Sequence, residues 1–240
     1  MNQPAHVTQV LADYAQRESG ETETWTPLRS EFELAFRLGA FYAMRQALTL
    51  LDAAPQKARI LDVGCGMGRS TRMYLDLGCE AEQLTGLDMR PGAIAVARRR
   101  HPAIRYVLHD GYGALVDGAA PDLVSMIAVL SSIKSHAGRA CLANRVIEAV
   151  KPGGEIFYFD LFRANDFAGR DRLRPVRLFS SCTPIWHRYF WSYEFIPRRE
   201  RLRALIYRIR SSTTYPQHTL RSHLIRHILP SFEALCVRKG

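Results

Sequence analysis

The feature that most constrains this chain is a glycine-rich turn that directly follows a short apolar run. Residues 60–63 (Ile-Leu-Asp-Val) are typical of a parallel strand that is covered on both faces. Gly64, Gly66 and Gly68 follow at alternate positions, and a helical pattern starts at Ser70. Because glycine has no side chain, a ligand can approach this backbone closely. We therefore expect a strand, a ligand-binding turn and a helix whose first amides point into the turn.

The glycine spacing and one acidic residue narrow the choice of ligand. The pattern G-x-G-x-G differs from the G-x-G-x-x-G of dinucleotide folds and the G-x-x-x-x-G-K-[ST] of phosphate loops. Asp62 stands two positions before the first glycine, where a carboxylate suits a cationic group and would repel a pyrophosphate. A methionine-derived ligand carries an ammonium and a sulfonium. The alternative is a turn that only packs the strand on the helix.

Four more strands are predicted after this turn. Residues 84–88 end at Asp88, where doubly wound sheets accept hydrogen bonds from ribose hydroxyls. Residues 104–110 end at Asp110, a place where an adenine amino group could be met. Residues 122–130 are nearly all apolar, as in a central strand, and a Lys-Pro-Gly-Gly turn leads into a fifth strand that ends at Asp160. This alternation with helical patterns predicts an α/β fold with a doubly wound sheet.

The motifs ILDVGCGMG, GLDM, DLVSMIAVLSS and VKPGGEI lie in this order between about residues 59 and 161. Together they resemble those of class I S-adenosylmethionine-dependent methyltransferases. The resemblance implies a seven-stranded Rossmann-like sheet, mostly parallel with an antiparallel last strand, and helices on both faces. It also implies S-adenosylmethionine as cofactor and S-adenosylhomocysteine as product. More loosely, the chain resembles methyltransferases of bacterial glycan and secondary-metabolite pathways, which implies O- or N-methylation of a small-molecule or saccharide acceptor.

The resemblance also assigns roles to individual residues. The expected cofactor-binding residues are Asp62, Gly64, Cys65, Gly66, Gly68, Asp88, Met89, Asp110, Gly111 and Ile127. The expected substrate pocket contains Tyr14, Leu130, Ser131, Ser132, Tyr158 and Arg163. Cys65 is interpreted as a small filler residue, because no partner base is near it in sequence. No metal is expected, since His223 and His227 lack the further ligands of a zinc site.

His136 and Asp160 are the predicted catalytic residues. Methyl transfer from a sulfonium depends mainly on alignment of the reacting atoms, and a general base is needed only when the acceptor must lose a proton. Both residues follow predicted strands, at the edge where ligands bind in open α/β sheets. Related enzymes often carry a histidine just after the fourth strand, where this chain has Ser131 and Ser132. The alternative is a solvated loop histidine and an acid that caps a neighbouring turn.

The chain of 240 residues predicts one continuous domain with three parts. Residues 1–55 are expected to form a helical lid, residues 56–162 the cofactor-binding core, and residues 163–240 a basic part that completes the sheet and carries inserted helices. The five cysteines are scattered, which predicts reduced thiols in a cytoplasm. The sequence has no apolar run of about 18 residues, so no membrane-spanning helix is predicted.

The basic residues are concentrated in the C-terminal third. Residues 161–240 hold 16 Lys and Arg against 5 Asp and Glu, whereas residues 1–160 carry a net charge of −1. This asymmetry fits an anionic substrate, a membrane surface or nucleic acid, or a merely solvated face. The predicted basic amphipathic helix at 197–210 is expected to cover the core, with a dimer interface or peripheral contact with an anionic membrane as alternatives.

The sequence leaves several alternatives for partners and activity. An RNA methyltransferase, a non-methylating enzyme of the cyclase type and an S-adenosylmethionine-binding regulator remain open. The sequence has no appended RNA-binding module, which argues against a nucleic-acid partner. A monomer and a homodimer are both compatible with the sequence.

Overall fold

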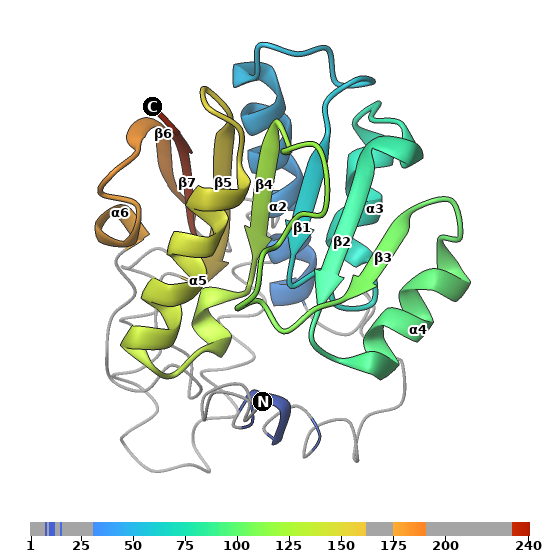
Figure 1. The fold of residues 1–240 in the computed structure, drawn as a ribbon. Coiled ribbons are helices and arrows are strands. Elements are labelled where there is room, and N and C mark those ends of the chain that lie inside the picture. The colour runs from blue at the N-terminus through green and yellow to red at the C-terminus, as the bar shows by residue number, and fades with distance from the viewer. Residues whose placement is uncertain (1–7, 9, 13–14, 16–30, 162–174, 191–231) are drawn as a thin grey trace, which may run out of the picture.

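The protein is described by a computed structural model that covers residues 8, 10–12, 15, 31–161, 175–190 and 232–240. Seven strands form one sheet (Figure 1). They are β1 (Ile60–Val63), β2 (Leu84–Asp88), β3 (Arg105–Leu108), β4 (Leu123–Ile127), β5 (Glu155–Leu161), β6 (Thr183–Phe190) and β7 (Phe232–Arg238). The helices are α2 (Glu31–Leu50), α3 (Arg69–Asp76), α4 (Pro91–Arg100), α5 (His136–Ala149) and α6 (Pro175–Leu178), with single 3₁₀ turns η1 (Ala81–Gln83) and η2 (Leu130–Ser132).

The strand order is β3-β2-β1-β4-β5-β7-β6. The first five strands are parallel, and β7 runs antiparallel to both of its neighbours, β5 and β6. The chain thus starts in the middle of the sheet, extends to one edge and then returns to build the other half. The order reverses between β1 and β4, and in such sheets ligands bind beside this reversal, at the carboxyl ends of the strands. The predicted seven-stranded, mostly parallel Rossmann-like sheet is confirmed.

Helices cover the sheet on both faces, as Figure 1 shows for α5 in front and α2 and α3 behind. On one face, Met44 of α2, Tyr74 of α3 and Ile94 of α4 are buried against the sheet. On the other face, the buried side chains of α5 include Leu142 and Val146. Each strand of the centre therefore has apolar neighbours above and below, which explains why the residues of β1 and β4 are buried without alternation.

The helix boundaries follow from local capping. Helix α3 ends before Gly78, whose φ of 89° lies in the left-handed region that C-terminal helix glycines adopt. Helix α4 starts at Pro91, because the fixed φ of proline suits the first position of a helix. Helix α5 starts at His136, where the Ser135 hydroxyl caps it by accepting a hydrogen bond from the Gly138 amide at 3.2 Å. This cap places His136 in the first turn of the helix.

Some predicted segments lie outside the described residues. They are residues 1–7, 9, 13–14 and 16–30 of the predicted lid, which include Tyr14, then Arg163, and the basic helix at 197–210. Of the described part of the lid, α2 packs against the sheet, whereas residues 8, 10–12 and 15 are helical and lie, in Figure 1, below the sheet near the carboxyl ends of its parallel strands. Among the described residues, no helix is long and apolar enough to cross a membrane.

Candidate cofactor site

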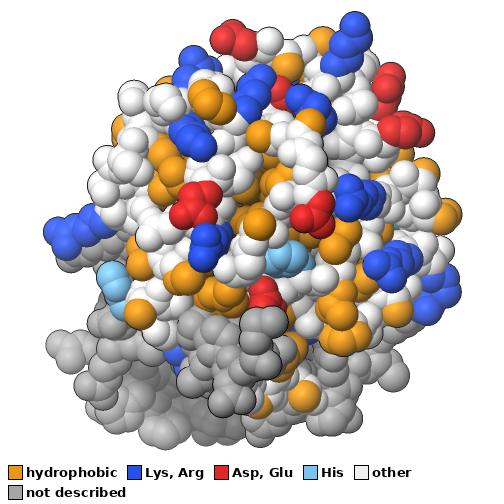
Figure 2. All heavy atoms as spheres, viewed as in Figure 1, with side chains coloured by type: hydrophobic (Ala, Val, Ile, Leu, Met, Phe, Trp, Pro, Cys, Tyr) orange, Lys and Arg blue, Asp and Glu red, His pale blue; other side chains and the backbone are white. Residues whose placement is uncertain are grey.

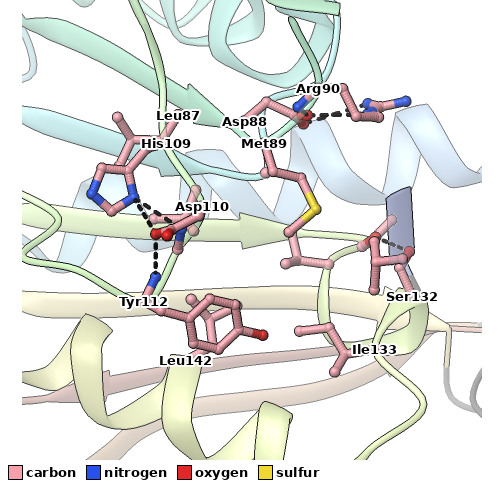
Figure 3. A pocket seen from close by; sticks show the side chains of 16 residues that line it. Leu87, Asp88, Met89, Arg90, His109, Asp110, Tyr112, Ser132, Ile133 and Leu142 are labelled. Carbon is pink, nitrogen blue, oxygen red and sulfur yellow. Dashed lines mark hydrogen bonds and ion pairs between the residues drawn. The ribbon is translucent and has the colours of Figure 1, made fainter. Parts of the chain in front are cut away.

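A cavity of about 90 Å³ lies at the carboxyl ends of β1, β2, β3 and β4. Its walls come from the glycine turn, the ends of β2 and β3, and the segment that connects β4 to α5 (Figure 3). The lining residues are Val10, Val63, Gly64, Leu87, Asp88, Met89, Arg90, His109, Asp110, Gly111, Tyr112, Ala128, Val129, Ser132, Ile133 and Leu142. In the space-filling view, which has the orientation of Figure 1, hydrophobic side chains gather at the centre beside acidic and histidine side chains (Figure 2).

The glycine turn has the backbone conformation that its sequence predicts. Gly64, Gly66 and Gly68 all have positive φ, at 73°, 56° and 80°. The space around the turn is also limited, because a Cβ on Gly64 would lie 2.6 Å from Val129 Cγ2 and one on Gly68 would lie 2.5 Å from the Tyr106 hydroxyl. Glycine is thus required here both for conformation and for close packing.

Asp62 is fully buried behind the turn and does not line the cavity. Its Oδ2 accepts hydrogen bonds from the hydroxyls of Ser70 at 2.6 Å and Thr71 at 2.7 Å, and its Oδ1 accepts one from Ser125 at 2.9 Å. Burial raises the pKa of Asp62, while the three hydroxyls oppose that rise. The carboxylate therefore ties the end of β1 to α3 and β4, and in this structure it holds the turn from behind.

Asp88 ends β2 and faces the cavity (Figure 3). Its Oδ2 accepts the Gly66 amide at 2.8 Å, and its Oδ1 accepts the Arg90 amide at 2.9 Å. The Arg90 side chain forms an ion pair with the same carboxylate, with Nε 3.0 Å from Oδ1. Asp88 thus links the glycine turn to the start of α4, and its side chain is only 6% exposed.

The loop after β3 presents a second carboxylate and two rings. Asp110 Oδ1 accepts the Tyr112 amide at 2.9 Å, and this hydrogen bond is the main cause that lowers the pKa of Asp110. His109 Nδ1 accepts the Gly111 amide at 2.9 Å, so its Nε2 carries the proton and donates to the Ala114 carbonyl at 2.9 Å. Burial raises the pKa of Tyr112 to about 12, so its phenol is neutral at physiological pH. The ring of Tyr112 lies beside Leu142 and Ile133 (Figure 3).

The structure brings part of the predicted set to the cavity. Six of the predicted residues line it: Gly64, Asp88, Met89, Asp110, Gly111 and Ser132. The other predicted residues that the structure describes do not line it: Asp62, Cys65, Gly66, Gly68, Ile127, Leu130, Ser131, Tyr158, His136 and Asp160. Cys65 is 3% exposed and burial raises the pKa of its thiol, which fits its interpretation as a filler residue.

The two predicted catalytic residues occupy different environments. His136 is exposed in the first turn of α5. Asp160 is fully buried, and its Oδ2 accepts the Ser131 amide at 3.0 Å, so it fixes η2 directly behind the cavity wall. Neither lines the cavity. Their roles in proton transfer stay predictions.

Several lining residues were not predicted from the sequence: Val10, Val63, Leu87, Arg90, His109, Tyr112, Ala128, Val129, Ile133 and Leu142. Arg90, His109 and Val129 each stand within two positions of a predicted site residue or strand end, which is a signal that sequence reasoning could have used. Leu142 comes from the middle of α5 and Val10 from the N-terminal region. No local motif marks those two.

The chemistry of this site fits S-adenosylmethionine. Two neighbouring strands end in carboxylates, Asp88 and Asp110, which accept hydrogen bonds from hydroxyl and amino groups. Apolar side chains such as Leu87 and Ile133 line the same cavity, as in most small-molecule sites. Among the described residues, no three His, Cys, Asp or Glu side chains gather in a group that would hold a metal ion. The cavity of about 90 Å³ is smaller than the roughly 300–1,000 Å³ of most small-molecule sites.

Comparison with known proteins agrees with this fold and site. Residues 60–154 match a family model described as a methyltransferase domain. The match covers the glycine turn and strands β1 to β4, and together with the strand order it supports a class I S-adenosylmethionine-dependent methyltransferase.

The sequence relatives match only part of their own length. A trans-aconitate 2-methyltransferase from Methylobacterium nodulans is 38% identical over 112 residues, which is 46% of this chain and 42% of that protein. A phthiotriol/phenolphthiotriol dimycocerosates methyltransferase from Mycobacterium leprae is 32% identical over 109 residues, covering 45% of this chain and 39% of that protein. The matched part thus spans about two fifths of these relatives.

Solved structures resemble nearly the whole chain at low sequence identity. The N-methyltransferase NodS from Bradyrhizobium japonicum, in complex with S-adenosylhomocysteine, aligns with a TM-score of 0.63 at 17% identity over 98% of this chain and 99% of that chain. The 1,6-didemethyltoxoflavin-N1-methyltransferase of Burkholderia thailandensis aligns with a TM-score of 0.61 at 18% identity over 100% of this chain and 92% of that chain. At this level of identity the likeness shows the fold alone.

Proposed function

We propose that this protein transfers a methyl group from S-adenosylmethionine to an oxygen or nitrogen of a small-molecule or saccharide acceptor. The observation that carries this proposal is the placement of Asp88 and Asp110 beside the glycine turn, in one cavity at the reversal of strand order. When bound there, S-adenosylmethionine supplies a methyl group that its sulfonium already activates. The protein's part is then to bind, to orient and to exclude water.

Each part of the site has a role in this proposal. Asp88 is positioned to accept hydrogen bonds from the ribose hydroxyls, and Asp110 to accept one from the adenine amino group. Ile133 and Leu142 pack against the adenine. Gly64 leaves its backbone open to the methionine part of the cofactor. The acceptor is expected beyond η2, over the ends of β4 and β5, where Ser132 already faces the cavity.

The relatives do not select one acceptor. Their names include trans-aconitate, phthiotriol lipids and malonyl-acyl-carrier protein, which are a small acid, a lipid and a protein-bound acyl group. An acceptor panel should therefore contain carboxylic acids besides hydroxyl- and amine-bearing metabolites and saccharides. A carboxylate acceptor would need no general base, because it is already deprotonated at neutral pH.

Calorimetric titration with S-adenosylhomocysteine tests the cofactor site. Asp88→Ala is expected to weaken binding by about ten-fold or more, since hydrogen bonds to a charged group contribute about 1.5–3 kcal/mol. The matched control is Asp76→Ala, which removes an exposed carboxylate at the end of α3 and is expected to leave affinity unchanged. Equal affinity of wild type and Asp88→Ala would refute the assigned role of Asp88.

Mass analysis of products separates the proposed activity from its alternatives. Wild-type protein is incubated with S-adenosylmethionine and the acceptor panel. A gain of one methyl group on an acceptor supports the proposal. A cyclised fragment of the cofactor would instead identify a cyclase-type enzyme. Tight binding of S-adenosylhomocysteine without any product across the panel would favour a cofactor-binding regulator.

A further inference from the structure

The Arg90 side chain folds back onto the carboxylate on which the proposed function depends. Nε of Arg90 lies 3.0 Å from Asp88 Oδ1, and its Nη2 lies 3.4 Å from Asp88 Oδ2. The guanidinium also lies next to the glycine turn, where a Cβ on Gly66 would be 3.1 Å from Nη2. Both side chains line the cavity, and Figure 3 shows the ion pair at its upper wall.

The acceptor positions of Asp88 are all in use. A carboxylate has about four lone-pair positions, two on each oxygen. In this structure Oδ1 accepts the amide and Nε of Arg90, and Oδ2 accepts the Gly66 amide and Nη2 of Arg90. The two amide donors belong to the backbone and hold the glycine turn and the start of α4. The two guanidinium donors are the ones that a side-chain rotation can remove.

A ribose presents two neighbouring hydroxyls and needs two acceptor positions on one carboxylate. It can obtain them on Asp88 only where the guanidinium now binds. The ion pair is shielded from water, because the side chains of Arg90 and Asp88 are only 16% and 6% exposed. Its loss on ligand binding therefore has a real cost, larger than for an exposed surface pair.

We propose that Arg90 competes with the ribose of the cofactor for Asp88, so that binding exchanges a guanidinium for a ribose diol and Arg90 lowers the affinity of the site. This inference rests on the proposed function, since it assumes that the site takes an adenosine ligand. Movement of the Arg90 side chain would also widen the small cavity at the glycine turn. Arg90 thus acts through Asp88 and favours release of a bound nucleoside.

Calorimetry with S-adenosylhomocysteine on Arg90→Met tests the exchange. Methionine keeps much of the length of the side chain but removes all of its donors, so two acceptor positions of Asp88 become available. We expect affinity to rise about ten-fold or more, because two hydrogen bonds to a charged group no longer have to be exchanged for hydrogen bonds to water. Arg90→Lys keeps the charge without the forked geometry, and its affinity should lie between the two.

Two further arms make the test specific. Arg72→Met is the matched control, because Arg72 forms an ion pair with Asp76 at the same distance of 3.0 Å but on the exposed surface of α3. The Arg72→Met variant should bind S-adenosylhomocysteine with the same affinity as wild type. The second arm compares adenosine with 2′,3′-dideoxyadenosine, and the gain in Arg90→Met should occur with adenosine alone.

The outcomes are distinguishable. Weaker or unchanged binding of S-adenosylhomocysteine by Arg90→Met would overturn this inference, and so would an equal gain with the dideoxy compound. Failure of every variant and of wild type to bind S-adenosylhomocysteine would overturn the proposed function as well. Melting temperatures of all variants, measured without ligand, identify any change that comes from stability alone.

Discussion

Replacing Thr71 by valine should test how the glycine turn is held in place. The Thr71 hydroxyl donates to Asp62 Oδ2 at 2.7 Å, and both residues are fully buried. Valine has nearly the same shape, so the substitution removes one hydrogen bond and leaves the packing intact. The carboxylate keeps the hydroxyls of Ser70 and Ser125 but loses one of its three side-chain donors.

The magnitude follows from the charge and burial of Asp62. A hydrogen bond to a charged group contributes about 1.5–3 kcal/mol, so the free energy of unfolding should fall by about that amount. For a chain of this size each kcal/mol corresponds to roughly 2–4 °C, which predicts a fall in melting temperature of about 3–12 °C. Differential scanning calorimetry at neutral pH measures it. The difference should narrow in acid, because the lost donor raises the pKa of Asp62 further and protonation of the carboxyl weakens the interaction.

The matched control is Thr49→Val on α2. Thr49 is exposed, and its hydroxyl donates to the Gln46 carbonyl at 2.7 Å within the same helix. Its substitution should change the free energy of unfolding by less than about 0.5 kcal/mol. Equal melting temperatures for Thr71→Val and Thr49→Val would refute the reasoning, because they would mean that Asp62 does not depend on its buried donors.

Two further predictions concern the turn and the start of β4. Gly68→Ala should lower the free energy of unfolding by more than the roughly 1–2 kcal/mol that a left-handed conformation costs a residue with a Cβ, because this Cβ would also lie 2.5 Å from the Tyr106 hydroxyl. Gly92→Ala is the control: the space around Gly92 is open, so this substitution should be neutral or stabilising. Chemical denaturation of both variants measures the difference. Burial raises the pKa of Asp122, but hydrogen bonds from Lys151 and the Arg59 amide outweigh it, so the net shift is downward from 3.8. The stabilisation that the Asp122 carboxylate provides is present above pH 3.8 and is lost as the pH falls through its lower folded pKa. Asp122→Asn should therefore be less stable than wild type at pH 7 and nearly equal to it near about pH 2. Melting curves recorded across this pH range measure the difference.

The fold was largely predictable because its signals are local. The apolar run of β1, the glycines after it and the acids that end β2 and β3 each mark a strand end within a few residues. The start of α5 has a weaker local signal, since Ser135 caps the helix without the glutamate that usually completes a capping box.

The site was only partly predictable because its carboxylates bind donors from several different elements. Asp62 has the expected position in the motif, yet hydroxyls from α3 and β4 bury it behind the turn. Arg90 follows Asp88 by two positions, but nothing in a sequence says that its guanidinium binds that carboxylate. Such binding depends on distances in space between groups of separate elements, which no spacing rule contains.

The position of β7 has a consequence for how this chain folds during synthesis. β6 runs parallel to β5 but forms no ladder with it, because β7 lies between the two and bonds to both. During synthesis, β6 therefore lacks its native neighbour in the sheet until residues 232–238 have left the ribosome. Up to that moment β5 is an unprotected edge, and its apolar residues Phe157 and Phe159 lack the neighbour that covers that edge. β7 closes a gap in the middle of this half of the sheet, so the described sheet is complete only when residues 232–238 are present.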